Sequence, residues 1–149
     1  MKKEKFDYKK IDVNEYGKLL YEMDIAVFNR DFDYPSPSIK MTLDYLKNCE
    51  VYLIYTENDV VGLFALKEAD DKTEVRQLIV LPKHQNKGYG KKIIKEILRI
   101  KKGKSIWLIA HPKNIHAIIL YLKNGFVIQG WKDNYYGDGQ PRIILNYVK

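Results

Sequence analysis

The sequence contains a single cysteine, Cys49, and no long uncharged apolar run. One cysteine excludes an intramolecular disulfide and favours the reducing cytoplasm as the location of the protein. No segment approaches the roughly 18–20 apolar residues that a membrane-spanning helix needs, so we expect no membrane partner. Internal repeats, low-complexity tracts and domain-separating linkers are also missing. The chain of 149 residues is therefore predicted to form one domain over residues 1–149.

Positive charge is in excess. The chain has 26 Lys and Arg residues against 19 Asp and Glu residues, which gives a formal net charge of +7. Such an excess favours an anionic partner, which can be nucleic acid, a membrane surface or a phosphorylated cofactor. The alternative is that the lysines only keep the surface hydrated. A nucleic acid is the least favoured partner, because the lysines are dispersed and no nucleic-acid-binding motif is recognisable.

Apolar periodicity and turn residues predict the elements of the first half. Helical spacing over residues 13–30 predicts a first helix, which the prolines of the 34–38 segment must end. Ser38 is a candidate N-cap for a second helix. The predicted strands are residues 51–55 and 60–66, which form a hairpin around the turn 57–59, and residues 74–81, which follow the turn 70–72.

The second half alternates between helix and strand. The predicted helices are residues 89–101 and 114–123, and the predicted strands are residues 105–110, 126–131 and 142–148. This order indicates a crossover unit with a parallel strand pair, attached to an antiparallel meander. The expected fold class is therefore a mixed α/β sheet with helices on both faces.

The segment from Leu78 to Lys92 carries the most chemical information. A buried strand runs into a short loop that opens an amphipathic helix, and helix starts bind phosphate through unpaired N–H groups. The P-loop and dinucleotide-binding fingerprints do not match, but Gln-x-x-Gly-x-Gly does, at Gln85, Gly88 and Gly90. The two glycines let the backbone approach a ligand, and the flanking lysines add positive charge. A tight turn without a ligand is the alternative interpretation.

This segment resembles the acetyl-CoA loop of the GNAT superfamily of N-acetyltransferases. The resemblance extends from Val51 to about Phe126 and is sharpest from Glu74 onward. It implies that main-chain amides of the loop hold the pyrophosphate of acetyl-CoA and that the preceding strand pairs with the pantetheine arm. The residues implicated in cofactor binding are Leu78, Ile79, Val80, Gln85, Asn86, Lys87, Gly88, Tyr89, Gly90 and Lys91, and no metal is expected.

The helix predicted over residues 114–123 resembles the GNAT helix whose tyrosine faces the CoA sulfur. The resemblance rests on Asn114, Tyr121 and the Gly125-Phe126 pair, and it adds Asn114 and Tyr121 to the cofactor-binding residues. Tyr121 is then the acid that protonates the departing thiol, with a packing role as the alternative. We expect Tyr121 at the edge of the buried face, beside an apolar stripe formed by Ile115, Ile118, Ile119 and Leu122.

The implied reaction is direct attack of a primary amine on the thioester through a tetrahedral intermediate. A backbone N–H near Val80 is expected to stabilise the oxyanion. The amine, with a pKa near about 10.4, must lose a proton first. Glu74 lies eleven residues before Gln85 and resembles the catalytic glutamate of the histone-acetylating branch, although a solvated carboxylate at a strand edge explains it equally well. His111 is a second candidate base, and a water chain ending at either residue is a third.

The acceptor amine is left open between polyamines, aminoglycosides, amino acids and proteins. The candidate substrate contacts, with surface loop positions as the alternative, are Asp31, Asp33, Tyr34, Tyr135 and Tyr136. A homodimer also stays open. Two other functions compete with acetyl transfer: a CoA-binding protein that transfers no acyl group, and a basic nucleic-acid-binding module.

Overall fold

The computed structural model describes residues 6–29, 38–57 and 59–148 and divides into two compact units. The first unit is formed by Met1–Lys67 and Arg76–Tyr89, and the second by Glu68–Val75 and Gly90–Lys149. Strand β4 (Lys72–Val80) contributes residues to both units. The strand order in the sheet is β1-β2-β3-β4-β5-β7-β6, which confirms the predicted mixed α/β class.

The first unit contains the antiparallel part of the sheet. Its elements are β1 (Asp7–Ile11), α1 (Gly17–Asp24), a π-helical turn (Ile25–Asn29), α2 (Ile39–Tyr45), β2 (Glu50–Thr56) and most of β3 (Asp59–Ala69). The hairpin of β2 and β3 is confirmed. Strand β1, which pairs antiparallel with β2, was not expected from the sequence. Its polar, partly exposed residues are typical of an edge strand and carry no apolar alternation.

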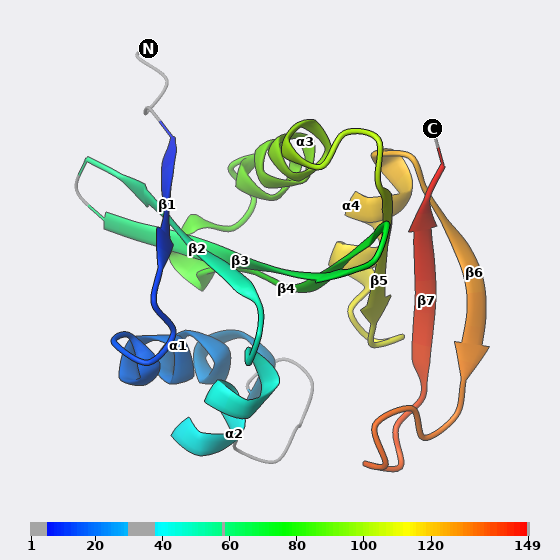
Figure 1. Cartoon of the computed structure of the whole chain (residues 1–149), viewed down its shortest axis with the longest axis horizontal. Coiled ribbons are helices and arrows are strands. Elements are labelled where there is room, and N and C mark those ends of the chain that lie inside the picture. Colours follow the sequence, from blue (N-terminus) through cyan, green and yellow to red (C-terminus); the bar gives the residue numbers. More distant parts are fainter. Residues whose placement is uncertain (1–5, 30–37, 58, 149) are drawn as a thin grey trace. The chain divides into compact units, whose positions relative to one another are not determined.

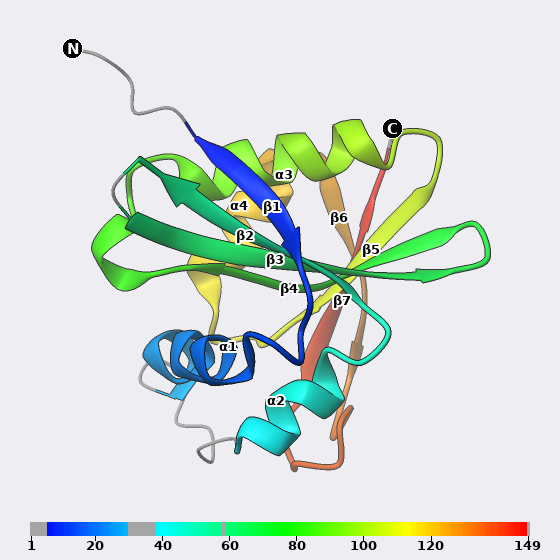
Figure 2. The same cartoon turned by 60° about the vertical axis from the view of Figure 1, so that its left-hand side comes forward.

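Helices α1 and α2 lie on the same side of strands β1 to β3, as Figures 1 and 2 show. The predicted cap of α2 is confirmed, because the Ser38 hydroxyl accepts a hydrogen bond of 3.0 Å from the Met41 amide. Apolar side chains of the helices meet those of the strands in one buried cluster. Its members are Leu20, Met23, Val27, Leu46, Val51, Leu53, Leu63, Ala65 and Ile79.

The second unit contains the crossover predicted from the sequence. Its elements are α3 (Tyr89–Ile100), β5 (Ser105–Ala110), α4 (Ile115–Lys123), β6 (Phe126–Lys132) and β7 (Arg142–Tyr147). The first residue of α3, Tyr89, is counted with the first unit. The first residues of β4 pair parallel with β5, which places Glu74 opposite Trp107. Strand β7 pairs antiparallel with both β5 and β6. Figure 1 shows β6 and β7 side by side at the C-terminal end of the chain.

The orientation predicted for α4 is wrong. Its side chains Ile115, Ile119 and Leu122 are 61%, 45% and 43% exposed, whereas Tyr121 is only 7% exposed. Helix α4 instead turns Leu120 towards the start of α3, where a Cβ on Gly90 would lie 2.7 Å from Leu120 Cδ2. Because α4 is apolar on nearly every side, its periodicity could not indicate which face packs.

Within the described ranges, no helix is both long enough and apolar enough to span a membrane.

Candidate active site

The loop between β4 and α3 is anchored at its base by hydrogen bonds within the first unit. The side-chain amide of Gln85 donates to the Val80 carbonyl over 3.0 Å, and Leu81 donates its amide to the Val61 carbonyl over 2.8 Å. A short 3₁₀ turn, Pro82–His84, lies between them. His84 Nε2 lies 3.0 Å from Asp59 Oδ2. Gln85 therefore shapes the loop, and its side chain is engaged with the protein itself.

Two residues of the loop have left-handed backbone conformations before α3 begins. Asn86 has a φ of 63° and Gly88 a φ of 86°, and residues 86–88 are exposed. A Cβ built on Gly88 would meet no atom within 4 Å. The glycine is thus required by its backbone conformation and not by crowding from the protein. Its backbone presents an open surface to which a ligand can come close.

The start of α3 is strongly positive. Its first turn contains no acidic residue, and Lys87, Lys91 and Lys92 all lie at or next to it with exposed side chains. Lysines repel the positive end of the helix dipole, so this arrangement costs free energy in the absence of an anion. A bound phosphate removes that cost and satisfies the unpaired amides of the first turn.

Two residues of the predicted loop, Tyr89 and Gly90, are explained by packing within the protein. Tyr89 is buried, stacks on Phe6 with the ring centroids 6.3 Å apart, and meets the His84 ring edge-on at 6.0 Å. In the second unit, Gly90 leaves room for Leu120. Both residues can therefore offer a ligand their backbone only.

Tyr121 is a largely buried polar side chain of the second unit. Its ring packs edge-on against Phe126, with centroids 5.4 Å apart, and the side chain is buried. Among the residues that the structure describes, its hydroxyl has no hydrogen-bonding partner. Burial raises the pKa of Tyr121 well above its ordinary value, so the hydroxyl stays protonated. The protonated hydroxyl can therefore donate a hydrogen bond to a bound ligand.

Asn114 has a structural explanation. It is the N-cap of α4, and its Oδ1 accepts a hydrogen bond of 3.3 Å from the Ala117 amide. This cap fixes the start of the helix that carries Tyr121. A contact between Asn114 and the cofactor stays a prediction.

A family model for the acetyltransferase (GNAT) domain matches residues 47–128. This chain belongs to the GNAT acetyltransferases. Over 126 residues it is 32% identical to the spermine/spermidine N(1)-acetyltransferase of Bacillus subtilis strain 168, covering 74% of this chain and 82% of that protein.

Solved structures share the fold of this acetyltransferase. An IAA acetyltransferase from Bacillus cereus ATCC 14579 matches with a TM-score of 0.78 at 19% identity, covering 96% of this chain and 99% of that one. A GNAT acetyltransferase from Elizabethkingia anophelis with acetyl-CoA bound matches with a TM-score of 0.77 at 21% identity, covering 99% and 100%.

The two candidate bases of this GNAT enzyme have different surroundings. Glu74 is only 7% exposed, so the alternative of a solvated carboxylate at the strand edge is wrong. His111 Nδ1 accepts a hydrogen bond of 3.0 Å from the Lys113 amide, which leaves the proton on Nε2, 3.2 Å from Gln140 Oε1. Burial lowers the pKa of His111. Both ring nitrogens are therefore engaged, which disfavours His111 as the base.

Sequence reasoning missed a half-buried acid in the first unit. Asp24, the last residue of α1, accepts a hydrogen bond of 3.0 Å from the side-chain amide of Gln77 in β4. Burial raises the pKa of Asp24 from 3.8 to about 6. The π-helical turn Ile25–Asn29 follows directly, and such turns occur often at functional sites. A signal was present in the sequence: an acid between Met23 and Ile25, in an otherwise apolar stretch.

The predicted substrate contacts are only partly covered by the structure. Asp31, Asp33 and Tyr34 lie outside the described residues. The rings of Tyr135 and Tyr136 meet edge-on at 4.8 Å. Each ring also lies under a cation. Lys132 Nζ is 5.4 Å from the centroid of Tyr135, and Arg142 Cζ is 5.1 Å from the centroid of Tyr136. Their role in binding an amine stays a prediction.

Proposed function

We propose that this GNAT enzyme transfers the acetyl group of acetyl-CoA to a primary amine of a polyamine. The single observation that carries the transfer is that Tyr121, an otherwise buried side chain, has a hydroxyl with no partner among the described residues. The acceptor class is supported by the identity of 32% with a spermine/spermidine N(1)-acetyltransferase.

The residues of the loop fit the cofactor. The main-chain amides of residues 86–91 would hold its pyrophosphate, with Lys87 and Lys91 supplying positive charge. The backbone of Leu78–Val80 would pair with the pantetheine arm. Gly88 has no side chain, and the space that a Cβ would occupy there is open, so a ligand can approach the backbone of the loop closely. When bound, acetyl-CoA supplies the thioester that the amine attacks.

Tyr121 acts on the leaving sulfur mainly as a hydrogen-bond donor. Its pKa, already about 10 without burial, exceeds that of a thiol, about 8.5, so complete proton transfer to the thiolate would cost at least about 2 kcal/mol. The raised pKa of Tyr121 increases this cost. A hydrogen bond from the hydroxyl stabilises the developing charge in a site from which water is excluded, without complete transfer.

Glu74 is the base that we assign to the amine. It is buried on β4, opposite Trp107. Along β5 the step from Trp107 to His111 corresponds to roughly 13 Å, so the two candidates do not lie together. A water can complete the path from the amine to Glu74.

Asp24 is the group that we assign to binding the cationic acceptor. The whole chain carries a net charge of +7, which repels a polyamine at long range. Binding therefore needs a local carboxylate that is partly shielded from water. Asp24 is such a group, because Gln77 occupies its Oδ1 and no described residue is paired with its Oδ2. An ammonium group can fill that position.

An amine panel tests the proposal. Thiol release from acetyl-CoA is measured with spermine, spermidine, an aminoglycoside, free lysine and a peptide with a free N-terminus. We expect release with the polyamines, and a strong decrease for Tyr121→Phe. Thiol release with the peptide but not with the polyamines would show that the acceptor is a protein amine and not a polyamine. No release with any amine, although acetyl-CoA binds, would contradict acetyl transfer itself.

A further inference from the structure

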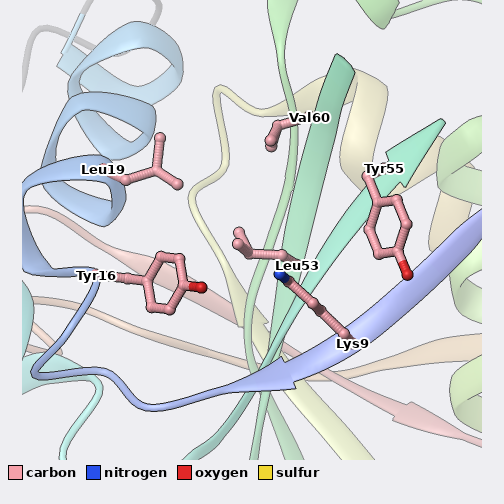
Figure 3. A pocket seen from close by; sticks show the side chains of 6 residues that line it. All are labelled: Lys9, Tyr16, Leu19, Leu53, Tyr55 and Val60. Atoms are coloured by element: carbon pink, nitrogen blue, oxygen red, sulfur yellow. The ribbon is translucent and has the colours of Figure 1, made fainter. Parts of the chain in front are cut away.

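A cavity of about 330 Å³ lies in the first unit and contains none of the residues assigned above. It is lined by Lys9, Tyr16, Leu19, Leu53, Tyr55 and Val60 (Figure 3). These residues come from β1, the start of α1, β2 and β3. The volume is in the lower range of pockets that hold small molecules, about 300–1,000 Å³.

The inner wall of the cavity is apolar. Leu53 is buried and belongs to the core cluster of the first unit, and Leu19 and Val60 pack against that cluster. Such a wall favours an aromatic ring or a short alkyl chain, because burying apolar surface contributes about 25 cal/mol per Å².

The polar groups around the cavity are all potential donors. The Lys9 ammonium lies 6.0 Å from the centroid of the Tyr16 ring. For the described part of the chain, neither Lys9 nor the hydroxyls of Tyr16 and Tyr55 have an acidic or accepting partner. Figure 3 shows the Tyr16 hydroxyl directed into the space between the labelled side chains. The Lys9 cation and the Tyr16 hydroxyl together suit a group with a single negative charge.

The start of α1 adds to this preference. Tyr16 is the residue before the helix, no side chain caps it, and its first turn contains no acid. The helix dipole therefore adds positive potential beside Tyr16. The nearest carboxylate in sequence to Val60 is Asp59, and Lys83 and His84 occupy it. Hydrogen bonding from Lys83, more than from His84, lowers the pKa of Asp59 to about 2.

We propose that this cavity binds a small monocarboxylate with an aromatic or short aliphatic body. The carboxylate meets Lys9 and the hydroxyl of Tyr16, and the body lies against Leu19, Leu53 and Val60. A polyamine does not suit the site, because Lys9 repels a cation. The inference is independent of the acetyl-transfer proposal, because it uses neither the loop residues 86–91 nor Tyr121.

Protein NMR with three isosteric probes tests this inference. Phenylacetate, phenylacetamide and phenethylamine share one ring and differ in charge. We expect phenylacetate to shift the amide resonances of Lys9, Leu19, Leu53 and Val60 saturably. Phenylacetamide should bind about tenfold more weakly, because it lacks the charge that pairs with Lys9. Phenethylamine should not bind there.

A matched pair of lysine variants isolates the ammonium group. Lys9 and Lys10 are exposed neighbours on β1, but alternation along the strand points Lys10 to the other face, away from the cavity. K9M should lower the affinity for phenylacetate about tenfold, and K10M should leave it unchanged. Thermal unfolding of both variants checks that each is folded.

Several results would overturn the inference. They are equal binding of the acid and the amide, equal effects of K9M and K10M, or shifts confined to residues 86–91. The absence of saturable shifts with both phenylacetate and hexanoate up to about 20 mM would also overturn it. A dissociation constant above that concentration is too weak for a specific site of this size.

Discussion

The side-chain amide of Gln77 donates a hydrogen bond of 3.0 Å to Oδ1 of Asp24 and so joins β4 to the end of α1. Gln77 directly precedes Leu78, the first residue of the strand segment that we assign to the pantetheine arm. Asp24 directly precedes the π-helical turn. This pair therefore connects the strand proposed to hold the cofactor with the helix proposed to hold the amine, within one unit.

Asp24→Asn is expected to stabilise the protein at neutral pH. The folded-state pKa of Asp24 is raised from 3.8 to about 6, so the folded state binds the proton more tightly than the unfolded state. The contribution of Asp24 to the free energy of unfolding therefore falls as the pH rises from about 4 to about 6. The variant should gain about 1–2 kcal/mol in the free energy of unfolding above pH 6, after allowance for solvent screening, and nothing near pH 3.

Denaturant unfolding at the two pH values checks this prediction. Glu22→Gln, on the same helix but exposed, is the control and should show no such pH dependence. An equal gain for Asp24→Asn at both pH values would show that burial of the charge is not its cause.

The same variant is expected to lose activity. Removing the carboxylate removes the partner of the ammonium group, so kcat/KM for spermidine should fall about 10–100-fold. The affinity for acetyl-CoA should not change, because Asp24 is not assigned to the cofactor. Steady-state kinetics with spermidine and a direct binding measurement with acetyl-CoA separate the two effects. An unchanged kcat/KM for every amine would remove Asp24 from the acceptor site.

Tyr121→Phe is expected to lower kcat about 10–100-fold without destabilising the fold. The hydroxyl has no partner among the described residues, so its removal leaves no group unsatisfied and the melting temperature should stay about equal. Tyr147→Phe is the control, because that ring also packs on Phe126, with centroids 5.6 Å apart. If both variants lower kcat equally, the loss reflects packing on Phe126 rather than a contact with sulfur.

Gly88→Glu is expected to abolish acetyl-CoA binding. The matched control is Gly103→Glu, because Gly103 also has a positive φ, of 90°, and a Cβ there also meets nothing within 4 Å. Both variants should cost about 1 kcal/mol or more in stability from backbone strain. Only the Gly88 variant adds a carboxylate at the positive start of α3. Calorimetric titration checks this, and equal acetyl-CoA affinities would exclude the loop as the cofactor site.

Local signals predicted most of the fold. Ser38 was recognisable as a cap because an N-cap depends on one side chain and the amide three residues later. The order of strands and helices indicated the parallel pair of β4 and β5. Strand β1 was missed, because an edge strand with polar side chains is stabilised by backbone pairing with β2 and not by apolar alternation.

The candidate site was less predictable where it depends on packing. The exposure of Ile115 and Ile119 and the burial of Tyr121 depend on how α4 packs in the fold, which includes a contact between Leu120 and Gly90, residues 30 positions apart along the chain. Asp24 was missed because its raised pKa arises from tertiary burial beside Gln77. The hydrogen bonds that engage both nitrogens of His111 are likewise set by the fold.

The central claim is that main-chain amides at the start of α3 hold the pyrophosphate of the cofactor. Amide NMR titration with CoA, and with pantetheine as a fragment without phosphate, tests it most directly. We predict that CoA shifts the amide resonances of residues 86–91 saturably, whereas pantetheine leaves them in place. Resonances of residues 86–91 that stay unmoved while CoA binds and shifts others would contradict the account.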